Sequence, residues 1–166
     1  TDAFQARGVG GTLPRVMESL TQHVRSVDVF ADSEPDPTTK SVDACAAFLK
    51  RGGFDCVVAL GGGSPMDTAK AAGVLAVHGG RMRDYKAPVL TDKPGLPVVA
   101  IPTTAGTGSE ATRFTIVTDA DSNEKMLCAG LAFLPIAAVV DYELTMTMPY
   151  RLTADTGIDA FCHAME

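Results

Sequence analysis

Two side chains near the end of the chain have the types and the spacing of metal ligands. Asp159 and His163 lie four residues apart in a segment, residues 154–166, that has a helical composition. Residues at this spacing project from one helical face with their Cβ atoms roughly 6 Å apart. A carboxylate and an imidazole on one face can hold two corners of a divalent metal site, although the same spacing also suits a simple surface pair. Two ligands rarely complete such a site, so other ligands are expected elsewhere.

Glycines dominate a second candidate site, Gly61-Gly62-Gly63-Ser64, which lies between an expected strand and a helix that begins near Pro65. Three glycines let the backbone approach an anion, and a helix N-terminus offers N–H groups with a partial positive charge. Asp67, inside the first turn, favours the helix dipole. The spacing fits neither GxGxxG nor a P-loop. An anion site and a plain strand-to-helix turn are therefore both open.

A threonine-rich loop at residues 102–110 also follows an expected strand. Both loops should then lie at the carboxyl edge of one sheet, which is where ligands bind in open α/β folds. The hydroxyls and two glycines of this loop suit the ribose and pyrophosphate of a nucleotide. The alternative is a polar, solvated loop in which Ser109 caps a turn. Two such loops at one edge favour a nucleotide more than either loop does alone.

The elements that must position these residues alternate between helices and strands. Helical spacing of apolar residues or helical composition predicts helices at 13–24, 38–51, 65–77 and from 149 onward. Short apolar runs predict strands at 27–31, 54–60, 98–101 and 137–140. A polar turn between 114–118 and 125–129 predicts a β-hairpin. Alternation of helices with buried strands predicts an open α/β sheet.

Composition argues against several classes of protein. The net charge of -6 disfavours nucleic acid as a main partner. The apolar stretch 126–140 is too short to span a membrane, and the first residues lack the apolar core of a signal peptide. A cytoplasmic protein with no membrane partner is expected. The four cysteines show no CxxC pair, so they are expected to be buried thiols in a reducing compartment: Cys45, Cys56, Cys128 and Cys162.

Taken in order, the motifs resemble the iron-containing (group III) alcohol dehydrogenases. The resemblance rests on GGGSPMDTAK at 61–70, PTTAGTGSE at 102–110 and DYELT at 141–145. It continues through Met148-Pro149, Thr153-Ala154, Gly157, Asp159-Ala160, His163-Ala164 and Glu166. These long, ordered motifs cover essentially the whole chain, which amounts to less than half of the family's usual length. Two departures are Asp36, where the family often has Asn between two prolines, and Tyr142, where proline is common.

The resemblance implies an α/β fold with two parts. Residues 1–148 would form a Rossmann-like nucleotide-binding domain of the dehydroquinate synthase-like fold, with its first strand missing before Thr1. Residues 149–166 would begin a truncated all-helical, metal-binding domain. Asp159 and His163 would be two of four metal ligands, and the others would be histidines on later helices. Cofactor-binding positions are implied at Asp2, Gly62, Gly63, Ser64, Asp67, Thr103, Thr104, Thr107, Thr112 and Lys125.

As an activity, the resemblance implies hydride transfer between a small alcohol or aldehyde and a nicotinamide cofactor. Asp2 matches an acidic residue that meets the adenosine ribose, which suggests NAD over NADP. Fe²⁺ is the implied metal, with Zn²⁺ as the other option, and a homo-oligomer, a dimer in first place, is the implied assembly. One alternative is a truncated nucleotide-binding module without redox activity. Another is a zinc-dependent enzyme like glycerol dehydrogenase, although those usually carry Lys where Ser64 stands.

Overall fold

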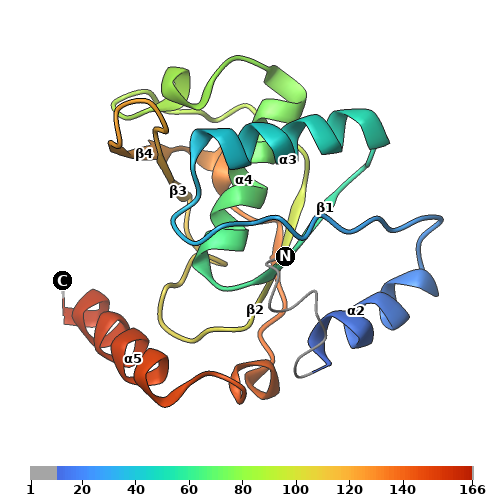
Figure 1. Ribbon diagram of the computed structural model, residues 1–166, viewed down its shortest axis with the longest axis vertical. Coiled ribbons are helices and arrows are strands. Elements are labelled where there is room, and N and C mark those ends of the chain that lie inside the picture. Colours follow the sequence, from blue (N-terminus) through green and yellow to red (C-terminus); the bar gives the residue numbers. More distant parts are fainter. Residues whose placement is uncertain (1–10, 166) are drawn as a thin grey trace.

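Three parallel strands form the centre of the computed structural model, which describes residues 11–165 of the chain (Figure 1). The strands β1 (Val57–Gly61), β2 (Val98–Pro102) and β5 (Ala137–Ala138) pair in the order β1-β2-β5. In the parallel register Val57 lies opposite Val98 and Gly61 lies opposite Pro102. Both longer strands therefore end at the same edge of the sheet. The prediction of an α/β fold with a parallel sheet is confirmed.

Two helices, α3 (Thr39–Gly52) and α4 (Gly63–His78), pack against each other, and α4 also contacts β1 and β2. The start of α3 follows from its sequence. The Thr38 hydroxyl accepts a hydrogen bond from the Ser41 N–H, and the Ser41 hydroxyl accepts one from the Thr38 N–H. This reciprocal capping box fixes the start of the helix that was predicted at 38–51. Gly53 ends α3 at φ +62°, a left-handed conformation that glycine adopts without a steric penalty.

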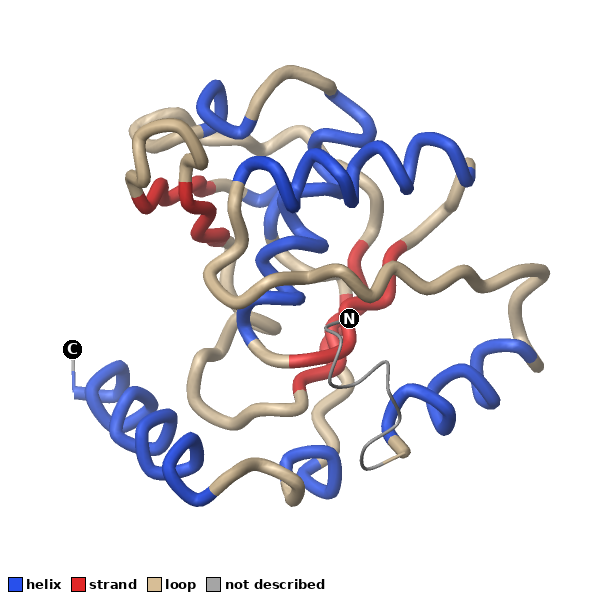
Figure 2. Tube along the Cα trace, in the orientation of Figure 1, coloured by secondary structure: helices blue, strands red, loops and turns tan. Residues whose placement is uncertain are grey.

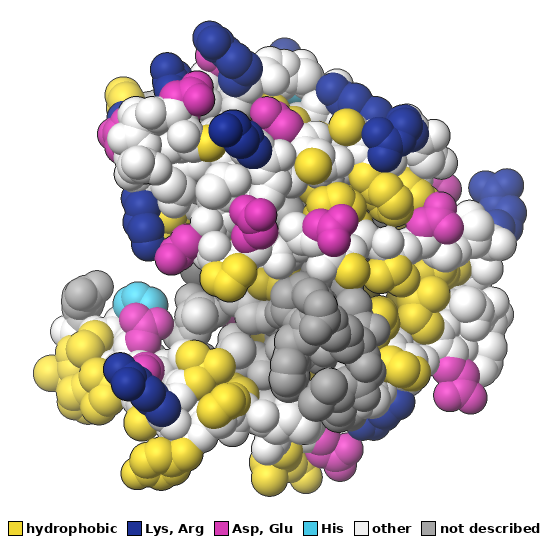
Figure 3. Space-filling model, viewed as in Figure 1, with side chains coloured by type: hydrophobic (Ala, Val, Ile, Leu, Met, Phe, Trp, Pro, Cys, Tyr) yellow, Lys and Arg dark blue, Asp and Glu magenta, His cyan; other side chains and the backbone are white. Residues whose placement is uncertain are grey.

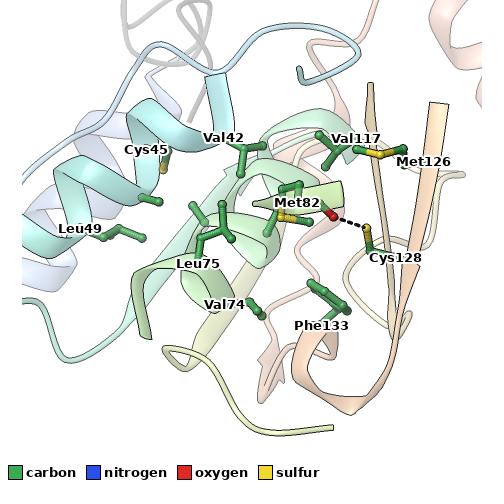
Figure 4. Close-up of a cluster of buried hydrophobic side chains, with 13 residues drawn as sticks. Val42, Cys45, Leu49, Val74, Leu75, Met82, Val117, Met126, Cys128 and Phe133 are labelled. Atoms are coloured by element: carbon green, nitrogen blue, oxygen red, sulfur yellow. Dashed lines mark hydrogen bonds between the residues drawn. The ribbon is translucent and has the colours of Figure 1, made fainter. Parts of the chain in front are cut away.

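An antiparallel hairpin of β3 (Phe114–Thr118) and β4 (Lys125–Ala129) confirms the predicted hairpin. The main hydrophobic core lies between this hairpin, α3 and α4 (Figure 4). Its fully buried side chains include Val42 of α3, Val74 of α4 and Val117 of β3. Because α4 contacts α3, the sheet and the hairpin, these elements together fix the position of its N-terminus, which carries the glycine loop.

Two helices lie at the lower side of Figure 1, away from this core: α2 (Thr12–Thr21) and α5 (Tyr150–Met165). Short 3₁₀ helices occur at η1 (Met82–Tyr85), η2 (Leu131–Phe133) and η3 (Tyr142–Thr145). Figure 2 shows that the chain leaves β5, passes through η3 and reaches α5 well outside the sheet. Within residues 11–165, none of the helices combines the length and the apolar character needed to cross a membrane.

Some sequence predictions are wrong in detail. Residues 27–31 form no strand, since a strand needs a neighbour for its N–H and C=O groups, and β1 pairs only with β2 in the described chain. The strand predicted at 54–60 begins at Val57, and the one predicted at 137–140 shortens to Ala137–Ala138. All four cysteines are free thiols, as expected. Cys56 and Cys162 are nevertheless exposed. Cys56 lies just before β1, and Cys162 lies on the peripheral α5.

Candidate functional site

The glycine loop and the threonine loop touch each other at the carboxyl edge of β1 and β2. The Thr103 N–H donates a hydrogen bond of 2.9 Å to the Gly61 carbonyl. A Cβ added to Gly62 would lie 3.1 Å from Thr104 Cγ2, and one added to Gly63 would lie 3.4 Å from Thr107 Cγ2. The two loops therefore form one surface, and a Cβ on Gly62 would make a tight contact with the Thr104 side chain.

This surface fits a bound anion. The N-terminus of α4 has Gly62 as its N-cap, and no side chain caps its N–H groups. Thr104 Oγ1 is buried and has no hydrogen-bond partner among the described residues. A buried hydroxyl without a partner costs free energy, which a bound polar group would recover. The uncapped N–H groups, the glycine cradle and the unpaired hydroxyl together suit the diphosphate of a dinucleotide.

Asp67, in the first turns of α4, has both carboxylate oxygens bonded within the protein. Oδ1 accepts a hydrogen bond of 2.8 Å from the Ser109 hydroxyl, and Oδ2 accepts one of 3.2 Å from the Ile116 N–H. Burial raises the pKa of this carboxyl, while those two hydrogen bonds and the nearby Lys70 act in the opposite direction. Asp67 thus connects α4 to the end of the threonine loop and to β3, and its predicted contact with a cofactor stays a prediction.

Lys70 is a buried cation in the same network. Its side chain is 1% exposed, and its ammonium donates to Ser109 Oγ at 3.2 Å and to Phe114 O at 3.0 Å. The ammonium also donates to Thr112 O and Thr112 Oγ1. Thr112, which was predicted to bind the cofactor, is therefore already hydrogen-bonded within the protein. Burial lowers the pKa of Lys70 to about 8, while Asp67 and Glu110 raise it.

Lys125 and Ser64 are brought together through Asp36. Lys125 Nζ lies 2.9 Å from Asp36 Oδ1, and the Asp36 N–H donates to Ser64 Oγ at 3.3 Å. Asp36 has φ +50°, so the turn between its two prolines aims the residue at the glycine loop in an uncommon conformation. The side chains of Lys125 and Asp36 are 64% and 75% exposed. An acidic and a basic side chain therefore stand beside the proposed diphosphate position.

Asp159 and His163 lie on α5 with the expected geometry of one helical face. His163 Nε2 and Asp159 Oδ1 are 3.8 Å apart, and both side chains are about half exposed. Two ligands at about 2.1 Å from one tetrahedral ion are about 3.4 Å apart, so a small side-chain rotation suffices. In residues 11–165 no three His, Cys, Asp or Glu side chains cluster as a metal site. The donor atoms of the two residues fit two ligand positions of a divalent ion, and their role as metal ligands stays a prediction.

The threonine loop also contacts α5, because Gly106 lies against Thr156. Figure 3 shows the surface indented between α5 and the part of the molecule above it. The structure therefore brings the two loops together and places α5 against the threonine loop at Thr156. Asp2 and Glu166 lie outside the described residues. Lys70, Ser109 and Asp36 were not predicted as site residues, although a lysine inside the small, apolar run of α4 was a visible signal.

A scan against protein families matches residues 1–142 to the model described as "Iron-containing alcohol dehydrogenase". The chain belongs to the iron-containing alcohol dehydrogenase family. Among the relatives of this family member, the NAD-dependent methanol dehydrogenase of Bacillus methanolicus is 40% identical over 166 residues. That alignment covers 100% of this chain, α5 included, and 43% of the methanol dehydrogenase.

Solved structures of other family members superpose closely on this one. An alcohol dehydrogenase from Oenococcus oeni has a TM-score of 0.94 at 30% identity, covering 99% of this chain and 43% of its own. A sulfoacetaldehyde reductase from Bifidobacterium kashiwanohense, solved in complex with NAD+, has a TM-score of 0.88 at 35% identity, covering 98% of this chain and 42% of its own. This chain thus spans less than half the length of these relatives.

Proposed function

We propose that this chain is the dinucleotide-binding part, with the first metal-ligand helix, of an NAD-dependent alcohol dehydrogenase. One observation carries the proposal: the glycine loop, the threonine loop and α5 meet at the carboxyl edge of β1 and β2. Open α/β sheets bind their ligands at that edge. The names of two relatives, a methanol dehydrogenase that is NAD-dependent and a reductase solved with NAD+, support the choice of NAD.

In this proposal residues 1–148 form a Rossmann-like domain of the dehydroquinate synthase-like type, and a helical metal-binding domain begins at residue 149. The backbone N–H groups after Gly62 bind the dinucleotide diphosphate at the N-terminus of α4. Thr104 Oγ1 donates to the same ligand and so gains the partner that it lacks. Thr103, Thr107 and Thr112 line the rest of the groove, and Asp2 meets the adenosine ribose.

Asp159 and His163 hold a divalent ion, Fe²⁺ in the leading form of the proposal and Zn²⁺ in the other. Such an ion supplies Lewis acidity when bound, and the nicotinamide supplies the hydride acceptor. The Asp159 carboxylate offsets the positive charge, and His163 must present a neutral nitrogen, so its protonation would weaken the site. The substrate class is a primary or short-chain alcohol, or the corresponding aldehyde, and the assembly is a homo-oligomer, with a dimer favoured.

A second candidate is a nucleotide-binding module without redox activity. It is favoured by the finding that no group of three metal-ligating side chains occurs within residues 11–165. Such a module would bind the dinucleotide with the same two loops and hold metal weakly. A glycerol dehydrogenase-like enzyme fits less well, because Ser64 stands where those enzymes usually carry Lys.

The deciding experiment measures binding and turnover in the protein that carries this sequence. NADH and NADPH are titrated by the change in cofactor fluorescence, and NAD⁺ reduction is followed with a panel of primary alcohols and diols after loading with Fe²⁺ or Zn²⁺. We expect NADH to bind more tightly than NADPH, and we expect turnover to depend on the added metal. Binding without turnover under either metal would leave the module as the function, and no binding of either cofactor would overturn both candidates.

A further inference from the structure

Gly106, in the middle of the threonine loop, lies against the backbone of α5. A Cβ added to Gly106 would lie 2.3 Å from the Thr156 carbonyl oxygen and 2.6 Å from Thr156 Cβ. Gly106 also has φ +147°, which residues with a side chain rarely adopt. Glycine is therefore required twice here, once by its own conformation and once by the closeness of the helix.

Thr156 is the only buried residue of α5 in the described part of the chain. Its hydroxyl donates to the Leu152 carbonyl at 2.8 Å, so its polar group is satisfied inside the helix. Ile158 and Phe161 on the same helix are 66% and 63% exposed. Within residues 11–165, α5 is therefore held against the loops by one small contact rather than by a broad hydrophobic face.

The contact shares a helical face with the metal pair. Asp159 and His163 follow Thr156 by three and seven residues, the spacing of side chains on one face. Along the helix axis they lie about 4.5 and about 10.5 Å from Thr156. The position and rotation of the helix at Thr156 thus fix where both ligands stand.

The same loop touches the glycine loop on its other side. Thr104 and Thr107 flank Gly106 and pack on Gly62 and Gly63, where the diphosphate is proposed to bind. A stretch of four residues, 104–107, therefore contacts both the dinucleotide cradle and the metal helix.

We propose that Gly106 and Thr156 are positioning residues, whose backbone contact sets the separation between the bound dinucleotide and the Asp159/His163 pair. This rests on the proposed dehydrogenase function. Hydride transfer depends steeply on the distance between donor and acceptor, and a misplacement of about 1 Å can cost on the order of 100-fold in rate. The dinucleotide binds to the two loops, and the metal ion binds to α5. The affinity for each of them should therefore depend far less on the contact between Gly106 and Thr156 than the rate of hydride transfer does.

Substitution Gly106→Ala tests this, with Gly108→Ala as its matched control. Gly108 lies two residues further along the same loop at φ +61°, and a Cβ there would meet nothing within 4 Å. Both variants strain the loop backbone, but only Gly106→Ala pushes on α5. For Gly106→Ala we expect kcat to fall at least 10-fold with a larger deuterium isotope effect on kcat, while the NADH dissociation constant changes less than threefold. Gly108→Ala should lower kcat by a smaller factor.

A distance measurement separates this inference from the proposed function. Cys56 beside β1 and Cys162 on α5 are the exposed thiols of the described chain, so both accept spin labels without substitution. Any exposed cysteine elsewhere in the protein is first replaced by serine. In Gly106→Ala the distance between the labels should shift or broaden, and in Gly108→Ala it should match the unsubstituted protein.

The outcomes are distinct. An unsubstituted protein without turnover would refute the dehydrogenase function, while the label distance would still report whether Gly106 positions α5. An unchanged label distance in Gly106→Ala would overturn the inference even in an active enzyme, and so would a kcat that stays constant or falls only in proportion to NADH affinity. If Gly106→Ala does not fold, Thr156→Gly, which removes the Cβ that lies against Gly106, must lower kcat more than it weakens NADH binding and more than Thr153→Gly at an exposed position of the same helix does.

Discussion

The Lys70 ammonium donates a hydrogen bond of 3.2 Å to the Ser109 hydroxyl across 39 residues of sequence. Ser109 in turn donates to Asp67, so a cation and a carboxylate of α4 both hydrogen-bond the same hydroxyl near the end of the threonine loop. The carbonyl and hydroxyl oxygens of Thr112 and the carbonyl oxygen of Phe114 share the remaining two N–H groups of Lys70. The helix that presents the glycine loop is thereby fastened to the end of the threonine loop. The relative position of the two loops depends on this buried charge.

Lys70→Met should destabilise the protein strongly. The methionine side chain has nearly the same length but donates no hydrogen bond, so Ser109, Thr112 and Phe114 lose a partner in a buried site. Asp67 would also lose its nearby cation. Removing one member of such a network typically costs about 3 kcal/mol, and urea-induced unfolding followed by circular dichroism measures it.

Lys40→Met is the matched control, because Lys40 is exposed near the start of α3. Its free energy of unfolding should stay within about 0.5 kcal/mol of the unsubstituted protein. Equal losses in the two variants would show that the buried network does not hold the loops.

The stability difference between the unsubstituted protein and Lys70→Met should grow with pH in the alkaline range. Burial lowers the pKa of Lys70 from 10.5 to about 8 in the folded chain. Between these values the unfolded chain still binds a proton that the folded chain has released, so this group adds stability as pH rises. The slope is at most about 1.4 kcal/mol per pH unit.

The control for this pH dependence is built into the comparison. Burial raises the pKa of the Cys45 and Cys128 thiols from 9.0 to about 11, so both thiols lower stability as pH rises above 9.0. That loss occurs in both proteins and cancels in the difference. Unfolding free energies at pH 7.5, 8.5 and 9.5 give the slope, and a difference that is flat or falls with pH would contradict the buried cation.

Much of the fold could be predicted because its signals are local. The hairpin at 114–129, the Thr38 cap and the strand-to-helix turn at 61–65 each depend on residues close in sequence. The strand predicted at 27–31 failed because pairing depends on a neighbour elsewhere in the chain. Local apolar composition cannot reveal whether that neighbour is present.

The candidate site was predictable only in part for the same reason. The sequence predicted that the two loops lie together, because neighbouring parallel strands end at the same edge of a sheet. The role of Lys70 has no local signal in the sequence, because its acceptors lie 39 to 44 residues away. The contact of Gly106 with Thr156 also joins distant segments, and nothing in the spacing of either residue indicates it.

Asp36→Asn should strengthen dinucleotide binding. Asp36 forms an ion pair of 2.9 Å with Lys125 and donates its N–H to Ser64, so its negative charge stands beside the proposed diphosphate position. Removing that charge frees Lys125 for the ligand and relieves repulsion of the phosphates. We expect the NADH dissociation constant to fall about threefold at low salt, with a smaller change at 0.5 M salt, because exposed charges are screened. Fluorescence titration of NADH at both salt concentrations measures it.

Asp32→Asn is the control for this prediction, since Asp32 is an exposed carboxylate on the same segment. It changes the net charge equally but should leave NADH affinity within experimental error. Equal effects of the two variants would mean that only overall charge matters. Weaker binding in Asp36→Asn would mean that the Asp36 carboxylate contributes to the cofactor site directly.

His163→Ala should lower metal affinity while leaving dinucleotide binding intact. His163 Nε2 lies 3.8 Å from Asp159 Oδ1, and the loss of one of these two donors removes a metal–ligand bond. The dinucleotide loops lie on other elements, so NADH should bind with a dissociation constant within twofold of the unsubstituted protein. Metal content after dialysis against a stated Zn²⁺ concentration, measured by mass spectrometry, should fall at least 10-fold.

Asp155→Asn provides the comparison on the same helix. Asp155 is exposed and pairs with Arg151 at 3.6 Å, with the same spacing of four residues as Asp159 and His163. If an acidic residue in an i, i+4 pair on α5 were enough to attract metal, Asp155→Asn would lose metal as well. Because a carboxylate beside a guanidinium is already neutralised, we expect it to keep the full metal content. Retention of metal by His163→Ala, or equal losses in both variants, would show that the Asp159/His163 pair is an ordinary surface pair.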